Sequence, residues 1–256
     1  MSGIHYRNGG YITSAKPTLT RSRGSTTINW SYSPAWNAGQ TAIVDRSSAN
    51  ITPSNNGTVY NSATAFSGTN SGSIYHDNAG DYVDATSSNF TFGTGDFTIM
   101  GWFNLSSYGT YSCLFEGASG GGGRTGTFVW LINSSGKLAL FSAGLFQFEG
   151  SSTVSTNTWN HLALIRSSGV IKCYLNGTLE AQTSTAIDVN TNFCRFGRIG
   201  DDSNGFTGKV SNYIVLKGTA LYTGNFTPNS TNEETASRVT TANVNTTTYG
   251  VYKLGY

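Results

Sequence analysis

Apolar and polar residues alternate along much of the chain with the period of two that is typical of β-strands. In the segment FTIMGWFNL, residues 97–105, Phe97 and Phe103 fall on one face, whereas Met100 and Trp102 fall on the other. Because both faces carry large apolar side chains, we expect this segment to be a central strand that is covered on both sides.

Two further stretches have the pattern of β-hairpins. Residues 128–142 (FVWLIN-SSG-KLALFS) and 161–175 (HLALIR-SSG-VIKCYL) each contain two β-rich runs joined by three residues that end in glycine. Glycine tolerates the left-handed conformation that the third position of such a loop requires. Further strands are predicted at residues 73–77, 80–85, 145–150, 194–200 and 208–217. No segment has the apolar period of an amphipathic helix, and the glycine run at 120–123 is expected to form a mobile loop.

The composition agrees with this all-β pattern and limits the partners. Only 11% of the residues are charged, against about 25% in ordinary soluble domains. The formal net charge of +2 argues against a nucleic-acid partner, which requires clustered lysine and arginine. No apolar run has the length of a membrane span, so no membrane partner is expected. The N-terminus lacks the basic and apolar regions of a secretory leader. We therefore expect synthesis in the cytosol without export by the general route.

The cysteines and the two ends of the chain predict further features of the domain. Three cysteines occur, at widely separated positions: Cys113, Cys173 and Cys194. Their spacing does not suit zinc, and we expect them to be small, buried, apolar residues, with a disulfide between two of them left open. Residues 1–35 and 232–256 differ from the middle and are predicted to be arms that flank one sandwich domain at 36–231.

Four stretches follow one another in the order in which a known family has them: GSIYHDNAGDYVDA (72–85), FGTGDFTIMGWFN (92–104), NTWNHLALIRSSGVIKCYLNGT (157–178) and FGRIGDDSNGFTGKVSNYIVLKGTAL (196–221). They resemble the opening strand pair, central strand, tryptophan-containing hairpin and final strand of laminin-G/pentraxin-like domains, a branch of the concanavalin A-like sandwiches. The family's aromatic-Asp-Gly turn is replaced here by His76-Asp77-Asn78. The resemblance implies an all-β, antiparallel two-sheet jelly-roll sandwich, to which we add extended N- and C-terminal arms.

A narrower resemblance concerns KGTALYTGNFTPN, residues 217–229. It is similar to a closing segment of laminin-G-like domains in the virion proteins of tailed bacteriophages. We expect Leu221, Tyr222 and Phe226 to fold back and seal the sandwich edge, and Pro228 to end strand pairing. A plain C-terminal closure in a protein of any source is the alternative. The resemblance implies a location in the virion, with assembly in the host cytoplasm.

The acidic residues and histidines do not suggest an enzyme. Glycan-hydrolysing sandwiches resemble one another in a strand that presents two carboxylates on one face, but residues 97–105 contain none. Asp201-Asp202 and Glu233-Glu234 are the adjacent acidic pairs, and neighbours in a strand point to opposite faces. We therefore expect no working pair of carboxylates. His161 is expected to be a packed, hydrogen-bonded residue, and His5 and His76 lack the context of a triad.

Calcium is the cofactor that the resemblance leaves open. Pentraxin-like relatives bind it through acidic and amide oxygens of neighbouring loops. Asp201 and Asp202 fall where such relatives carry acidic ligands, and Asn204 adds another oxygen. The other half of the site would fall at residues 124–126, which contain no Asp or Asn. Because calcium takes six to eight oxygens, half a site predicts weak binding or none. No other cofactor is expected.

Carbohydrate binding is the remaining chemistry. Tyr108, Tyr111 and Phe146 fall in or near predicted loops, where aromatic rings could stack on sugars. The preferred hypothesis is a non-enzymatic virion structural protein, displayed on the capsid or tail exterior. Its arms would hold it to other virion proteins and to copies of itself. The alternative is a glycan-binding lectin or adhesin, such as a tail-fibre tip that recognises cell-surface glycans. A calcium-dependent adhesion module is disfavoured because it would require export.

Overall fold

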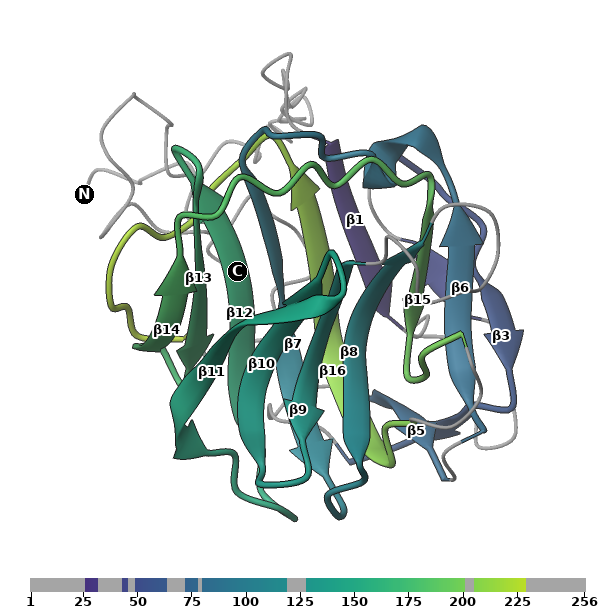
Figure 1. Ribbon diagram of the computed structural model, residues 1–256. Coiled ribbons are helices and arrows are strands. Elements are labelled where there is room, and N and C mark those ends of the chain that lie inside the picture. Colours follow the sequence, from purple (N-terminus) through teal and green to yellow (C-terminus); the bar gives the residue numbers. More distant parts are fainter. Residues whose placement is uncertain are drawn as a thin grey trace, which may run out of the picture.

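In a computed structural model of the protein, the described residues are 26–31, 43–45, 49–63, 72–77, 80–118, 128–200 and 205–228. They form two antiparallel β-sheets (Figure 1). The larger sheet has nine strands: β1 (Thr26–Ser31), β2 (Val44–Asp45), β4 (Val59–Asn61), β5 (Ser73–His76), β7 (Phe97–Leu105), β12 (Asn160–Ser167), β13 (Val170–Leu175), β14 (Thr178–Thr183) and β16 (Gly208–Lys217). The smaller sheet has seven: β3 (Ser54–Asn56), β6 (Tyr82–Thr86), β8 (Tyr111–Ala118), β9 (Phe128–Asn133), β10 (Lys137–Ser142), β11 (Leu145–Thr153) and β15 (Phe193–Phe196).

The strand order within each of the two sheets is as follows. Hydrogen-bonded neighbours in the larger sheet follow the order β14-β13-β12-β7-β16-β1-β2, and β5 and β4 continue from β16. The smaller sheet has the order β11-β10-β9-β8-β15-β6-β3. The described ranges contain no α-helix, only the 3-10 turn Ser88–Phe90, so the all-β prediction is confirmed. None of the described residues belongs to a helix with the length and apolarity needed to cross a membrane.

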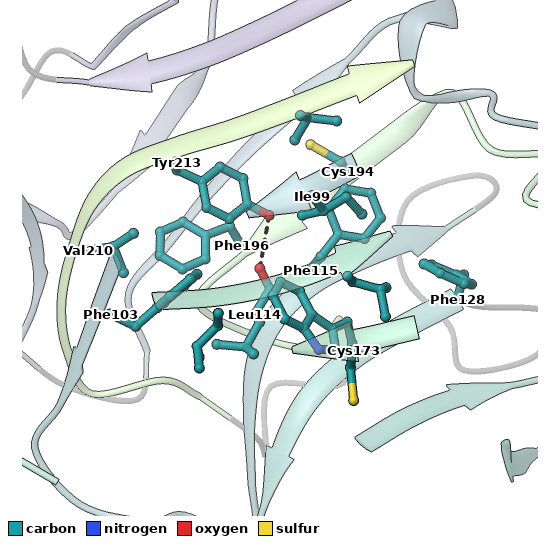
Figure 2. Close-up of a cluster of buried hydrophobic side chains, with 14 of the residues drawn as sticks. Ile99, Phe103, Leu114, Phe115, Phe128, Cys173, Cys194, Phe196, Val210 and Tyr213 are labelled. Carbon is teal, nitrogen blue, oxygen red and sulfur yellow. Dashed lines mark hydrogen bonds between the residues drawn. The ribbon is translucent and has the colours of Figure 1, made fainter. Parts of the chain in front are cut away.

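The hydrophobic core lies between the two sheets and follows from the alternation in the strands. Phe97 and Phe103 of β7 are completely buried, as predicted, and Phe103 meets Trp130 of the opposite sheet edge to face at 6.2 Å. Figure 2 shows Phe103 among core side chains of the other sheet, such as Phe115 and Phe196. Cys113, Cys173 and Cys194 are free and buried, which confirms the apolar role predicted for them.

A segment after β16, residues 218–228, covers the outer face of the nine-stranded sheet. We call it the closing segment. Its Leu221 and Phe226 are buried together with Met100 of β7, so β7 is covered on both faces. The Leu221 N–H donates to Thr98 Oγ1 at 3.0 Å, and the Phe226 N–H donates to the Gly177 carbonyl at 2.9 Å. The segment therefore folds back as predicted, but it covers a sheet face and not the sandwich edge.

The two predicted hairpins differ in their turns. Gly136 has φ 76°, as the three-residue loop between β9 and β10 requires. The β12–β13 loop contains two residues, Ser168 and Gly169, both left-handed, because Ser167 still pairs with Val170. Two-residue turns of this kind match the twist of the flanking strands. The three-residue loop predicted at this second hairpin is therefore wrong by one residue.

Parts of the predicted organisation fall outside the described residues. β1 lies within the predicted N-terminal arm, yet it pairs with β16 and belongs to the larger sheet. The other residues of both predicted arms, and the glycine run at 120–123, are not among the described residues. The domain limits therefore stay a prediction.

Candidate functional site

The outer face of the seven-stranded sheet, which points away from the core, carries a second set of apolar residues. On β8, β9 and β10 the side chains that alternate with the core positions are themselves buried: Cys113, Val129, Leu131 and Ala139. Tyr111 and Phe141 pack against this set and are only partly buried. This face therefore combines an apolar floor with aromatic side chains that reach solvent.

A tight turn brings a third aromatic ring to this face. Ala143 and Gly144 both have left-handed backbone conformations (φ 53° and 79°), which lets β11 turn back directly after β10. In Figure 1 the first part of β11 crosses in front of β10. The Phe146 ring centroid lies 5.4 Å from that of Phe141 and 5.9 Å from that of Tyr111, and Phe146 stays 49% exposed. We call Tyr111, Phe141 and Phe146 the aromatic cluster.

Polar side chains stand beside the aromatic cluster. Asn133 is the β9 residue opposite Tyr111, and its Nδ2 donates to Glu149 Oε2 at 2.6 Å. Its Oδ1 accepts from the backbone N–H groups of Ser135 and Lys137, both at 3.0 Å, which fixes the orientation of the amide. Lys137 Nζ lies 3.6 Å from Glu149 Oε1, and these two side chains are 33% and 52% exposed. We call Asn133, Lys137 and Glu149 the polar group; it presents charged and hydrogen-bonding atoms to solvent.

A row of charged residues crosses the same sheet further along. Arg195 of β15 lies opposite Glu116 of β8 on one side and opposite Asp84 of β6 on the other. Opposed residues of antiparallel strands share a face, so all three point outward. Arg195 Nη2 lies 3.2 Å from Asp84 Oδ2, and its guanidinium lies 4.2 Å from the centroid of the Tyr82 ring. Glu116 Oε2 accepts from the Gly200 N–H at 2.9 Å.

This row places two carboxylates on one face of the smaller sheet, which bears on the expectation of no working pair of carboxylates. Glu116 and Asp84 are far apart in the sequence, so they do not appear among its adjacent acidic pairs. Arg195 nevertheless stands between them, and Glu116 is only 1% exposed. Glycoside hydrolysis requires a protonated acid and a nucleophile or base that face one bond of the substrate. The arrangement lacks that open space between two accessible carboxyl groups.

The three residues predicted to bind glycans lie in two places. Tyr111 and Phe146 meet in the aromatic cluster, Tyr111 as the first residue of β8 and Phe146 as the second residue of β11. Tyr108 lies against the Gly136 turn, where its hydroxyl donates to the Val154 carbonyl at 2.6 Å. The residues of the predicted calcium site, Asp201, Asp202 and Asn204, lie outside the described residues, so that site stays a prediction.

The sequence pattern does not distinguish Phe141, Asn133 or Glu149 as residues of the site. In β10 the inward residues Leu138 and Leu140 alternate with Ala139 and Phe141. Because both sets are apolar, the alternation does not reveal which residues face outward. Glu149 joins the site through a side-chain bond to a strand that is not its neighbour in the sheet. No signal in the sequence points to that contact.

Groups that could carry other chemistry are buried. Burial lowers the pKa of His161 to about 3 and, despite a hydrogen bond to the Asp81 carbonyl, lowers that of His76 to about 4. His161 is packed, as predicted, but its Nδ1 has no hydrogen-bond partner among the described residues. Burial raises the pKa of the Cys173 thiol to about 12, which disfavours a reactive thiolate. The described residues contain no group of three His, Cys, Asp or Glu side chains that could hold a metal ion.

Together these features define a two-sheet β-sandwich that presents an aromatic and polar surface on its smaller sheet. Residues 76–221, more than half of the chain, match a laminin-G family model described as the concanavalin A-like lectin/glucanases superfamily. The chain belongs to this superfamily, as the sequence resemblance implied. No curated protein sequence matches it.

Several solved structures are similar to the chain. Domain 4 of an extracellular GH43 arabinanase from Geobacillus stearothermophilus, in complex with arabinotriose, is 16% identical with a TM-score of 0.53; the match covers 68% of this chain and 87% of that one. Trypanosoma rangeli sialidase in complex with sialic acid is 11% identical with a TM-score of 0.56, and 85% of this chain covers 34% of the sialidase. Botulinum neurotoxin type C, whose cell entry depends on interaction with two ganglioside molecules, is 16% identical with a TM-score of 0.50. The match covers 77% of this chain and 48% of that one. At these identities the likeness shows the fold alone.

Proposed function

We propose that the protein is a non-catalytic carbohydrate-binding sandwich and that the aromatic cluster is its ligand-binding surface. The observation that carries the proposal is the half-exposed Phe146 ring, held against Tyr111 beside the Asn133–Glu149 hydrogen bond. Exposed aromatic rings next to a few well-placed polar groups are what a sugar-binding surface requires. The arabinotriose complex of the similar arabinanase domain supports carbohydrate as the ligand class.

A glycan array followed by calorimetry tests this function. We expect the full chain to bind a defined set of oligosaccharides and the Phe146→Ala variant to lose at least about tenfold in affinity, because one stacking partner is removed. Leu179→Ala is the matched control, since Leu179 is an exposed apolar side chain of the other sheet (37% exposed). Unchanged affinity in Phe146→Ala would show that the sugar binds elsewhere.

A structural role on a virus particle is the second candidate. It is favoured by the likeness of residues 217–229 to the closing segment of laminin-G-like phage virion proteins, and residues 218–228 do close one sheet face here. In this role the sandwich is displayed on the capsid or tail, and the chain ends bind other virion proteins or copies of itself. Display on a particle and glycan binding are compatible, because repeated copies multiply weak binding.

Truncation tests the virion role. Removal of residues 1–25 spares β1, and removal of residues 235–256 spares the closing segment. If these ends are anchors, either truncated chain should remain folded but be missing from purified particles. Full occupancy of both truncated chains in the particles would exclude anchoring by the ends.

A further inference from the structure

We propose, on the basis of the carbohydrate-binding function, that the ligand is a neutral oligosaccharide and that Glu149 selects it by accepting hydrogen bonds from its hydroxyl groups. This assigns the polar group a specificity role beside the stacking role of the aromatic cluster.

The position of Glu149 suits this role. Its Oε2 accepts from Asn133 Nδ2 at 2.6 Å, and the amide that holds it is itself fixed by two backbone N–H groups at 3.0 Å. The side chain is nevertheless 52% exposed. A carboxylate has about four acceptor positions and no donor, so Glu149 keeps accepting capacity toward solvent and toward the O–H groups of a sugar.

The aromatic cluster lies within reach of the same ligand. Tyr111, which contacts Phe146 at 5.9 Å, is the direct cross-strand neighbour of Asn133. A sugar ring placed on Phe146 would bring its edge hydroxyls toward Glu149, because both residues project from β11 onto the outer face. Phe146 and Phe141 have no polar atoms, so they bind the apolar C–H face of a sugar and add no charge preference.

The charges of this face argue against an acidic sugar. Among the described residues of the outer face, Lys137 is paired with Glu149 and Arg195 with Asp84, and Glu116 adds a third carboxylate. Arg198 donates to the Gly80 carbonyl at 3.1 Å, and its guanidinium lies 5.5 Å from the centroid of the Tyr82 ring. Recognition of a carboxylate is strongest with an arginine fork that is free to bind it. A uronic or sialic acid would instead place its negative charge near Glu149 and compete for a lysine that is already paired. A neutral sugar meets neither obstacle.

The experiment compares neutral and acidic ligands of matched length. Arabinotriose and cellotriose are titrated into the full chain beside sialyllactose and trigalacturonate, by calorimetry at low and at physiological salt. We expect binding of a neutral trisaccharide with little salt dependence. The variant Glu149→Gln, which keeps one oxygen acceptor, should weaken that binding about tenfold or more, because hydrogen bonds to a charged group are the stronger ones. Leu179→Ala, on the other sheet, is the control and should leave that binding within about threefold.

The outcomes separate this inference from the function on which it rests. Tighter binding of an acidic trisaccharide, lost in both Phe146→Ala and Lys137→Gln, would overturn neutral selectivity and leave the carbohydrate-binding function intact. Glu149→Gln with unchanged affinity for the neutral ligand would remove Glu149 from the site. If no oligosaccharide binds the unmodified chain, the proposed function itself fails. Unchanged thermal unfolding of each variant shows that the effects are not losses of folding.

Discussion

At the scale of single residues, the fold holds two histidines in surroundings that exclude their charged form. His161 lies between Trp102 and Phe226, whose ring centroids are 5.3 and 5.6 Å away. His76 contacts Phe196 at 4.6 Å. Burial is the main cause that lowers both pKa values, to about 3 for His161 and about 4 for His76. In an unfolded chain both would have pKa values of about 6.5.

This difference predicts that the protein loses stability as the pH falls. Below pH 6.5 the unfolded chain takes up protons on these histidines while the folded chain does not, until the folded pKa values of about 3 and 4 are reached. Each histidine then lowers the free energy of unfolding by up to about 1.4 kcal/mol per pH unit. Urea unfolding between pH 7 and 5 measures the slope, and His161→Gln should remove about half of it. A flat profile would contradict the burial of the two rings.

Arg166 is a second residue whose surroundings predict a large effect. Its guanidinium donates to the carbonyls of Gly93, Gly95 and Ile187 at 2.6, 2.6 and 2.7 Å. It also lies 4.9 Å from the centroid of the Phe97 ring. A lysine has one compact donor group that cannot reach three carbonyls in different directions. We expect Arg166→Lys to lower the free energy of unfolding by about 2–4 kcal/mol, measured by urea unfolding. Arg198→Lys, at a half-buried arginine, is the control and should cost less than about 1 kcal/mol.

At the scale of elements, the largest buried side chain of the closing segment is Phe226. Phe226 stacks on Tyr222 at 3.7 Å and meets Tyr174 edge to face at 5.4 Å. Phe226→Ala should therefore cost about 3–5 kcal/mol, as the loss of a buried aromatic side chain does. Thr223→Ala is the control, because Thr223 is exposed and its carbonyl, not its side chain, accepts from Lys172 Nζ. A loss below about 1 kcal/mol in Phe226→Ala would show that the segment is held mainly by its backbone hydrogen bonds.

The elements also show how far the sequence predicts the structure. The hairpins at β9–β10 and β12–β13 are predictable, because alternation and a glycine turn are local features. β8 is not, because a bulge between Cys113 and Phe115 places both Leu114 and Phe115 in the core and breaks the alternation. Of the candidate site, the sequence predicts two single aromatic residues, Tyr111 and Phe146, but not that they are in contact. Tyr111 and Phe146 meet because β11 turns back over the sheet, a contact between strands that do not pair.

At the scale of the whole molecule, a hydrogen bond between two irregular strands, β8 and β16, links the two sheets across the core. The bulge in β8 removes the Leu114 carbonyl from regular pairing with β9, and β16 has its own irregularity between Ser211 and Ile214. Tyr213 of β16 donates its hydroxyl to that carbonyl at 2.9 Å, across the interior, as the dashed line in Figure 2 shows. A buried carbonyl without a partner would be costly, so the tyrosine hydroxyl makes the bulge tolerable.

Tyr213→Phe tests this connection without changing the packing volume. The variant leaves the Leu114 carbonyl buried and removes its Tyr213 donor, so we expect the free energy of unfolding to fall by about 1–3 kcal/mol. Tyr174→Phe is the matched control: that hydroxyl is also buried, but it has no hydrogen-bond partner among the described residues. Its removal should be neutral or slightly stabilising, because an unsatisfied polar group is lost. Urea unfolding followed by tryptophan fluorescence measures both. Equal effects in the two variants would mean that the hydrogen bond from Tyr213 to the Leu114 carbonyl does not stabilise the folded protein.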